Sequence, residues 1–162
     1  MTLILRIFDV EHGACAMLAG MDHHALAMVD CGHNATTGWC PSKFLRERMR
    51  RGDLDYLLVT NADQDHISNL SALRQAGINV RHLISNPYVS PEALRWIKEQ
   101  SGTLTDDAEA LLEMRRNFGP PGSGTPFNDA MGGVTVRSFQ HHFPTFVTTN
   151  NLSCAYFLKF GQ

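Results

Sequence analysis

The chain has 162 residues, of which 43% are hydrophobic and 19% charged, so it is long enough to bury a core and too apolar to be disordered. Lys and Arg number 14 against 16 Asp and Glu, a formal charge of -2, which excludes an overall basic field of the kind that drives binding to nucleic acid or membranes, although a cleft could still be locally basic. No apolar run reaches the roughly 18 residues of a membrane helix. We therefore expect one domain, residues 1–162, in the cytoplasm and away from membranes.

Three short runs rich in β-forming residues open the chain, over residues 3–10, 14–18 and 25–29. Gly13 and residues 19–22 separate them with turn-forming residues, which predicts two hairpin-like connections. The later elements expected in chain order are a helix over 41–51, strands 54–60 and 78–84, a helix beginning at 66 or 67, helices 90–100 and 105–118, a Gly/Pro loop over 119–126, and strands 134–139 and 154–160.

The four cysteines are scattered and form no C-x-x-C pair. This spacing argues against a disulfide scaffold or a thiolate zinc site and favours free thiols in a reducing compartment. They are Cys15, Cys31, Cys40 and Cys154.

Four side chains that can ligate a metal ion fall within residues 61–66, directly after the strand over 54–60; they are Asn61, Asp63, Asp65 and His66. A short loop at a strand end can aim several side chains at one point, and alternate positions point to the same side while the loop stays extended. Carboxylate and carbonyl oxygens favour Mg²⁺ or Mn²⁺, whereas imidazole admits Zn²⁺ or Fe. One interpretation is a site for one or two divalent ions.

The same residues are also ordinary turn and cap residues. Asp65 could cap a helix that begins at His66 or Ile67. On spacing alone, both interpretations stay open.

The string 60–66, Thr-Asn-Ala-Asp-Gln-Asp-His, resembles the metallo-β-lactamase signature Thr/Ser-His-x-His-x-Asp-His. In the branch that includes the bacterial competence (DNA-internalisation) proteins, the second His is already an Asp. Residues 8–14 resemble that branch's opening Asp-Val-Gly-x-Gly-Asp-Ala, residues 29–32 its Ile-Asp-x-Gly, and residues 150–153 its Asn-x-x-Ser before a late strand.

This resemblance implies an α/β (α+β) fold, the αββα sandwich of the metallo-β-lactamases, of which this chain would hold the first half to two-thirds. It places Asn61 and Asp63 at the first-metal positions, Asp65 and His66 at the second-metal positions, and Asp30 in a loop near the site. Asn61 replaces the family's first histidine, and a neutral amide oxygen is a poorer Zn²⁺ ligand than imidazole. The first metal would then be weak, a harder ion, or absent. We expect Zn or Mn, with Mg or Fe as alternatives.

In the family, the late strand is followed by a Gly-Asp motif and later by a His-His-Gly motif that supply further ligands, whereas this chain ends at Gln162 directly after its late strand. We therefore expect a domain incomplete at its C-terminus; a truncated chain, a reduced relative and a second chain that completes the site stay open. Strand 154–160 would lack a neighbour, and an apolar strand edge usually needs one. A homodimer or a second chain is therefore expected as partner.

His142 and His12 are weaker candidate ligands. His142, next to His141, follows the strand over 134–139, and His12 follows the first strand, but both are more simply loop residues. Likewise, a basic run could contact phosphates, although interleaved acids favour a solvated helix face; its members are Arg46, Arg48, Arg50 and Arg51.

The resemblance implies a metal-dependent hydrolase in which metal-activated water attacks a phosphodiester or related ester, with a nucleotide or nucleic acid as substrate. Asp65 would also orient that water as the catalytic residue. The loop over 119–126 could act as a lid. The alternative is a catalytically degenerate domain that binds or scaffolds, and Asn61 favours it.

Overall fold

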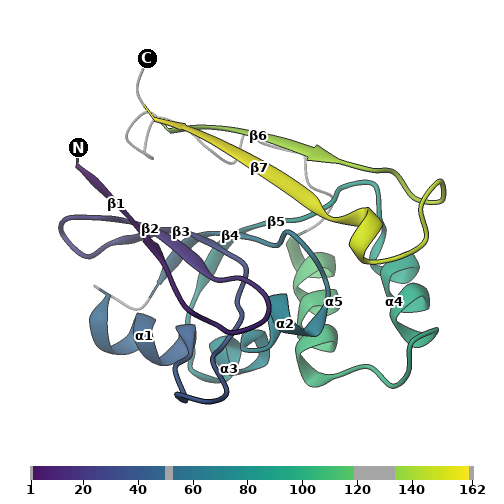
Figure 1. Cartoon of the computed structure of the whole chain (residues 1–162), viewed down its shortest axis with the longest axis horizontal. Coiled ribbons are helices and arrows are strands. Elements are labelled where there is room, and N and C mark those ends of the chain that lie inside the picture. The colour runs from purple at the N-terminus through teal and green to yellow at the C-terminus, as the bar shows by residue number, and fades with distance from the viewer. Residues whose placement is uncertain (1, 50–52, 119–133, 161–162) are drawn as a thin grey trace.

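The structure is a computed structural model that describes residues 2–49, 53–118 and 134–160 (Figure 1). The expected loop over 119–126, with its suggested role as a lid, and residues Arg50 and Arg51 lie outside this part.

A five-stranded sheet forms the middle layer, in the order β1-β2-β3-β4-β5. Its strands are β1 (Leu3–Ile7), β2 (Ala16–Gly20), β3 (Ala25–Val29), β4 (Leu54–Leu58) and β5 (Val80–Ile84). The first three pair antiparallel, which confirms the two hairpin-like connections, and β3, β4 and β5 pair parallel. Strand β2 begins later than expected because the Ala14 carbonyl accepts a hydrogen bond from the Gly32 amide, in another loop, rather than from a strand.

Helices cover one face of this sheet (Figure 1). They are α1 (Pro41–Arg48), α2 (Gln64–Ile67), α3 (Leu70–Gln75), α4 (Pro91–Glu99) and α5 (Asp106–Phe118). Between the helices and the sheet lies the larger core, whose fully buried side chains include Leu45, Leu57, Ile67 and Leu111.

The helix expected to begin at residue 66 or 67 is in fact two short helices that meet at Asn69. Here the Asn69 amide donates to the Cys31 carbonyl at 3.0 Å, and its side-chain oxygen accepts from the Ser42 amide at 2.9 Å. These long-range bonds hold the chain in a non-helical conformation at this residue.

A second sheet of two strands, β6 (Val134–Gln140) and β7 (Cys154–Phe160), lies over the other face of the five-stranded sheet (Figure 1). The expectation that the last strand lacks a neighbour is wrong, because β7 pairs antiparallel with β6 along its whole length. Tyr156 fastens this layer to the first sheet, since its hydroxyl donates to the carbonyl of Val59 at 3.1 Å and also reaches that of Ile84 at 3.3 Å.

The four cysteines are free thiols, as the sequence predicts. Burial raises the pKa of Cys15 to about 12 and that of Cys31 well above its ordinary value. Among the helices that the structure describes, none is long and apolar enough to cross a membrane.

Candidate functional site

Two glycine-containing loops close around the backbone of Asp65 at the start of α2. A Cβ atom on Gly13 would lie 2.2 Å from the Asp65 carbonyl oxygen, and one on Gly32 would lie 2.5 Å from the same atom. Both distances are far below van der Waals contact, so only glycine allows this approach. The two loops therefore fix where α2 begins.

We predict that Gly32→Ala lowers the free energy of unfolding by about 2 to 3 kcal/mol, because the new methyl group meets backbone atoms that cannot move aside. Urea unfolding followed by circular dichroism measures the change. Gly77→Ala is the control: its Cβ meets nothing within 4 Å, so only the left-handed backbone at φ +70° opposes it, at about 1 kcal/mol. Equal losses in the two variants would contradict the prediction.

Asp30 is the buried centre of the site. It directly follows β3 with a left-handed φ of +57°, and its side chain is fully shielded from solvent. One carboxylate oxygen accepts from the Thr60 amide at 2.7 Å, and the other accepts from the Thr60 hydroxyl and from His66 Nδ1, the latter at 2.9 Å. The carboxylate thus ties the end of β3 to the loop after β4 and to α2.

This contact decides how His66 presents its ring. An ionised carboxylate can only accept, so His66 Nδ1 carries the hydrogen and Nε2 of the neutral ring keeps its lone pair. The hydrogen bond from Asp30 raises the pKa of His66; burial opposes the rise, and the negative charges of Asp30, Asp65 and Asp63 add to it. The arrangement is the carboxylate–histidine pair that orients metal-ligating imidazoles.

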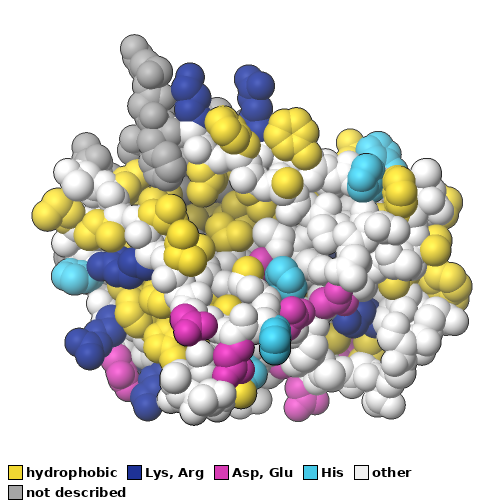
Figure 2. All heavy atoms as spheres, viewed as in Figure 1, with side chains coloured by type: hydrophobic (Ala, Val, Ile, Leu, Met, Phe, Trp, Pro, Cys, Tyr) yellow, Lys and Arg dark blue, Asp and Glu magenta, His cyan; other side chains and the backbone are white. Residues whose placement is uncertain are grey.

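Asp65 lies beside the free nitrogen of His66. Its Oδ2 atom is 4.0 Å from His66 Nε2, and its side chain is 45% exposed against 22% for His66. The expectation that Asp65 caps the helix is wrong, because Asp65 lies within the first turn of α2 and Asp63 occupies the cap position, without a capping hydrogen bond. Figure 2 shows His and acidic side chains grouped at the centre of the face where α2 lies in Figure 1.

Both oxygens of the Asp63 carboxylate accept hydrogen bonds from side chains of the protein. Its Oδ1 accepts from the Thr149 hydroxyl at 2.6 Å and lies 3.5 Å from the Lys98 ammonium, and its Oδ2 accepts from the Asn61 amide at 3.2 Å. Lys98 reaches it from α4, is only 19% exposed and also donates to the Ala62 carbonyl at 3.0 Å. A positive charge of the chain itself therefore already lies at Asp63.

Asn61 is likewise engaged as a structural residue. Its carbonyl oxygen accepts from the Asp63 amide at 3.1 Å, and its amide nitrogen also donates to Asn150 at 3.0 Å. Asn150 belongs to the patch over residues 150–153, so the structure brings that patch to the loop after β4. The Cys154 amide extends the contact by donating to the Thr60 carbonyl at 2.6 Å.

The two weaker candidates lie elsewhere. His142 stacks on Tyr88 with ring centroids 3.6 Å apart, and His12 is exposed in the loop between β1 and β2. Neither joins Asp65 and His66 in a cluster, because residues 2–49, 53–118 and 134–160 contain no group of three or more His, Cys, Asp and Glu side chains that could hold a metal ion.

Two contributors to the site have no local signal in the sequence: Lys98 and Thr149 reach Asp63 from positions far along the chain. The same holds for Asp107 at the start of α5. Its carboxylate accepts from the Gln64 side chain at 2.7 Å and from the Ser71 amide at 2.8 Å. These hydrogen bonds join α2 and α3 to the start of α5.

The described donors fit a metal centre only in part. Asp65 and His66 offer an oxygen and an oriented nitrogen that no hydrogen bond within the described residues occupies, which suits one divalent ion with its other ligands from elsewhere. Asn61 and Asp63 do not fit, because Lys98 and the hydrogen-bond donors already surround the Asp63 carboxylate.

The family model of the metallo-beta-lactamase superfamily matches residues 10–158. The chain therefore belongs to the metallo-beta-lactamase superfamily, a family of metal-dependent hydrolases that commonly bind divalent metals. The mixed α/β architecture with its five-stranded sheet agrees with that fold. No curated protein and no solved structure matches the chain significantly.

Proposed function

We propose that this chain is a metal-dependent hydrolase domain of the competence-protein type that cleaves a phosphodiester or related ester, with Asp65 and His66 as the metal ligands. The observation that carries the proposal is the buried Asp30 carboxylate, which holds His66 Nδ1 at 2.9 Å and leaves Nε2 directed toward Asp65. Zn²⁺ and Mn²⁺ suit one imidazole and one carboxylate.

A divalent ion, when bound, polarises water and a phosphoryl oxygen as a Lewis acid. The residues of the chain do the positioning. Asp30 fixes the ring and tautomer of His66, and the loops at Gly13 and Gly32 fix the backbone of Asp65. Because Asp65 is almost half exposed, solvent reaches its carboxylate, which would orient the attacking water.

Metal content and phosphodiester hydrolysis test this proposal. Protein prepared with Mn²⁺ or Zn²⁺ is expected to retain about one equivalent and to hydrolyse bis(4-nitrophenyl) phosphate. Asp65→Ala and His66→Ala should lose both the metal and the activity, whereas Asn61→Ala, which removes a residue engaged in the loop, should keep the metal. Retention of metal in the two ligand variants would overturn the assignment, and bound metal without hydrolysis would overturn the substrate class.

The second candidate is a domain that keeps the fold and binds or scaffolds without catalysis. Lys98 favours it, because its ammonium lies at the Asp63 carboxylate, one of the two acidic groups of the 61–66 string. No metal bound by the parent protein, even with Mn²⁺ and Zn²⁺ in excess, is the result expected for this candidate. A second chain as partner, or a homodimer, is then what size-exclusion chromatography with light scattering should detect.

A further inference from the structure

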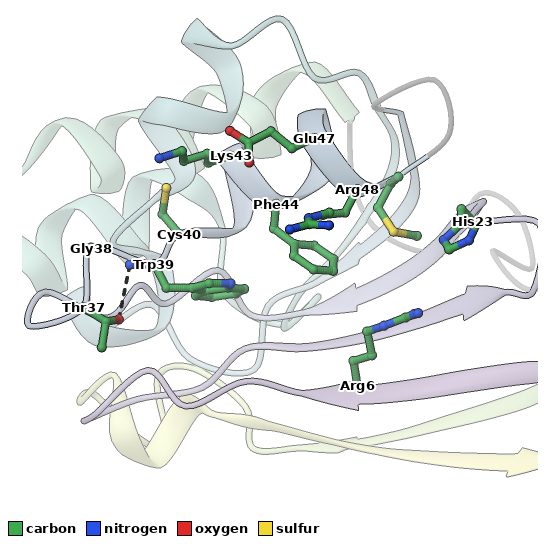
Figure 3. Close-up of a pocket in the computed structure, with 11 residues that line it drawn as sticks. Arg6, His23, Thr37, Gly38, Trp39, Cys40, Lys43, Phe44, Glu47 and Arg48 are labelled. Atoms are coloured by element: carbon green, nitrogen blue, oxygen red, sulfur yellow. Dashed lines mark hydrogen bonds between the residues drawn. The ribbon is translucent and has the colours of Figure 1, made fainter.

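A separate cavity of about 750 Å³ opens between strand β1, the loop over residues 37–40 and helix α1 (Figure 3). Its volume is that of sites that bind drug-sized molecules or nucleotides. None of the residues of the 61–66 string lines it. The cavity is therefore a candidate binding site in its own right.

Positive side chains outnumber negative ones in the lining. Arg6 projects from β1, and Lys43 and Arg48 come from α1, against one carboxylate, that of Glu47 (Figure 3). Among the described residues, Arg6, Lys43 and Arg48 form no ion pair. The Nη1 atom of Arg6 is shielded from solvent and has no hydrogen-bond partner in the part of the chain that the structure describes. The charges of Arg6, Lys43 and Arg48 together exceed that of Glu47 in the lining, so the cavity favours an anion.

Two aromatic rings form another part of the wall. Trp39 and Phe44 line the cavity, and Phe8 supports them from the side of the core. The Phe8 and Trp39 rings stack with centroids 4.3 Å apart, and Phe44 packs edge-on to Phe8 at 4.9 Å. This packing holds the Trp39 ring in place, so a planar ligand ring can stack against it without ordering a mobile side chain.

We propose that this cavity binds a small anion that carries a planar aromatic ring, of which a nucleoside monophosphate is the simplest example. Arg6 and Arg48 bind the phosphate, and Trp39 and Phe44 contact the ring. The inference does not rest on the proposed hydrolase, because it uses no residue of the metal centre. It also gives part of the basic run on α1 a role: Arg48 lines the cavity, whereas Arg46 does not.

Calorimetric titration with AMP in the presence of EDTA tests the proposal, so that failure of the metal centre cannot affect the result. We expect saturable binding of AMP, with adenosine and inorganic phosphate each weaker by about tenfold or more, because each makes only one of the two contacts. Arg6→Met and Arg48→Met should each weaken AMP binding by about tenfold. Arg46→Met, on the same helix but outside the cavity, should bind as the parent does.

Tryptophan fluorescence places the ligand. The chain has two tryptophans, Trp39 and the exposed Trp96 on α4. In a Trp96→Phe background, AMP is expected to change the emission of Trp39. No binding of AMP, equal losses in Arg46→Met and Arg48→Met, or inorganic phosphate binding as tightly as AMP would each overturn the proposal. Arg48 is exposed, so its variant tests the site even if Arg6→Met fails to fold.

Discussion

Asp30→Asn is expected to lower the pKa of His66 and to weaken divalent-ion binding by about tenfold to a hundredfold. Asparagine tolerates the left-handed backbone at this position and has the size of aspartate, so the loop can keep its shape. The amide group, however, can donate to Nδ1 of His66. The ring then carries its hydrogen on Nε2, the nitrogen that faces Asp65, and loses the lone pair that a metal needs.

The pH dependence of stability gives a readout that needs no metal. The folded-state pKa of His66 is raised above its unfolded value, so the stabilisation from its protonation is fully present below the unfolded pKa. It fades as the pH rises through the raised folded-state pKa. In EDTA, the loss of unfolding free energy in Asp30→Asn should therefore be larger near about pH 6 than near about pH 9.

Urea unfolding across this range, with an NMR titration of the His66 ring, measures both effects. Asp55→Asn is the control, because it removes a second close His–Asp contact of the described residues, between His24 and Asp55 at 2.8 Å, and should leave His66 unchanged. An unchanged His66 pKa in Asp30→Asn would contradict the role assigned to the buried carboxylate. Asp30→Ala should be less stable still, by about 3 to 5 kcal/mol relative to the parent, because buried donors lose their acceptor.

Local patterns predict most of the secondary structure, because the signals lie within each element. Ser90 and Pro91, for example, indicate a cap and a first-turn proline, and the Ser90 hydroxyl does accept from the Ala93 amide at 3.1 Å. Predictions that depended on distant partners failed. The single helix expected after residue 66 is interrupted at Asn69, because that residue bonds to Cys31 and to Ser42.

At the candidate site, the sequence left two interpretations of residues 61–66 open, as turn residues or as metal ligands. The structure supports the first interpretation for one pair of these residues and leaves the second open for the other pair. Asn61 and Asp63 bond to each other across a tight turn, as turn residues do. Asp65 and His66 offer atoms that could bind a metal ion, and their role as metal ligands stays a prediction. The difference arises from Lys98 and Thr149, which lie 35 and 86 residues from Asp63 in sequence, so no spacing rule could have found them.

Lys98→Met is expected to strengthen Mn²⁺ binding by about tenfold or more, because a divalent ion beside Asp63 no longer meets a positive charge. Methionine keeps the approximate length and apolar character of the lysine stem, and the Lys98 side chain is only 19% exposed. Both partners of the ion pair are partly exposed, so its loss should lower the stability of the metal-free protein by less than about 1 kcal/mol.

The variant also distinguishes the two proposed functions. If Lys98 has replaced a metal ion at Asp63, removal of its ammonium should let Asp63 join Asp65 and His66 as a ligand. Adding Asn61→His to the Lys98→Met variant should then supply an imidazole and strengthen Mn²⁺ binding further. Arg95→Met, which removes a positive charge from the same helix where Glu99 and Glu109 already neutralise it, is the matched control and should bind Mn²⁺ as the parent does. Calorimetric titration measures all four proteins. Unchanged affinity in Lys98→Met would mean that Asp63 serves the fold alone, held by Thr149 and Asn61 whether or not the ammonium is present.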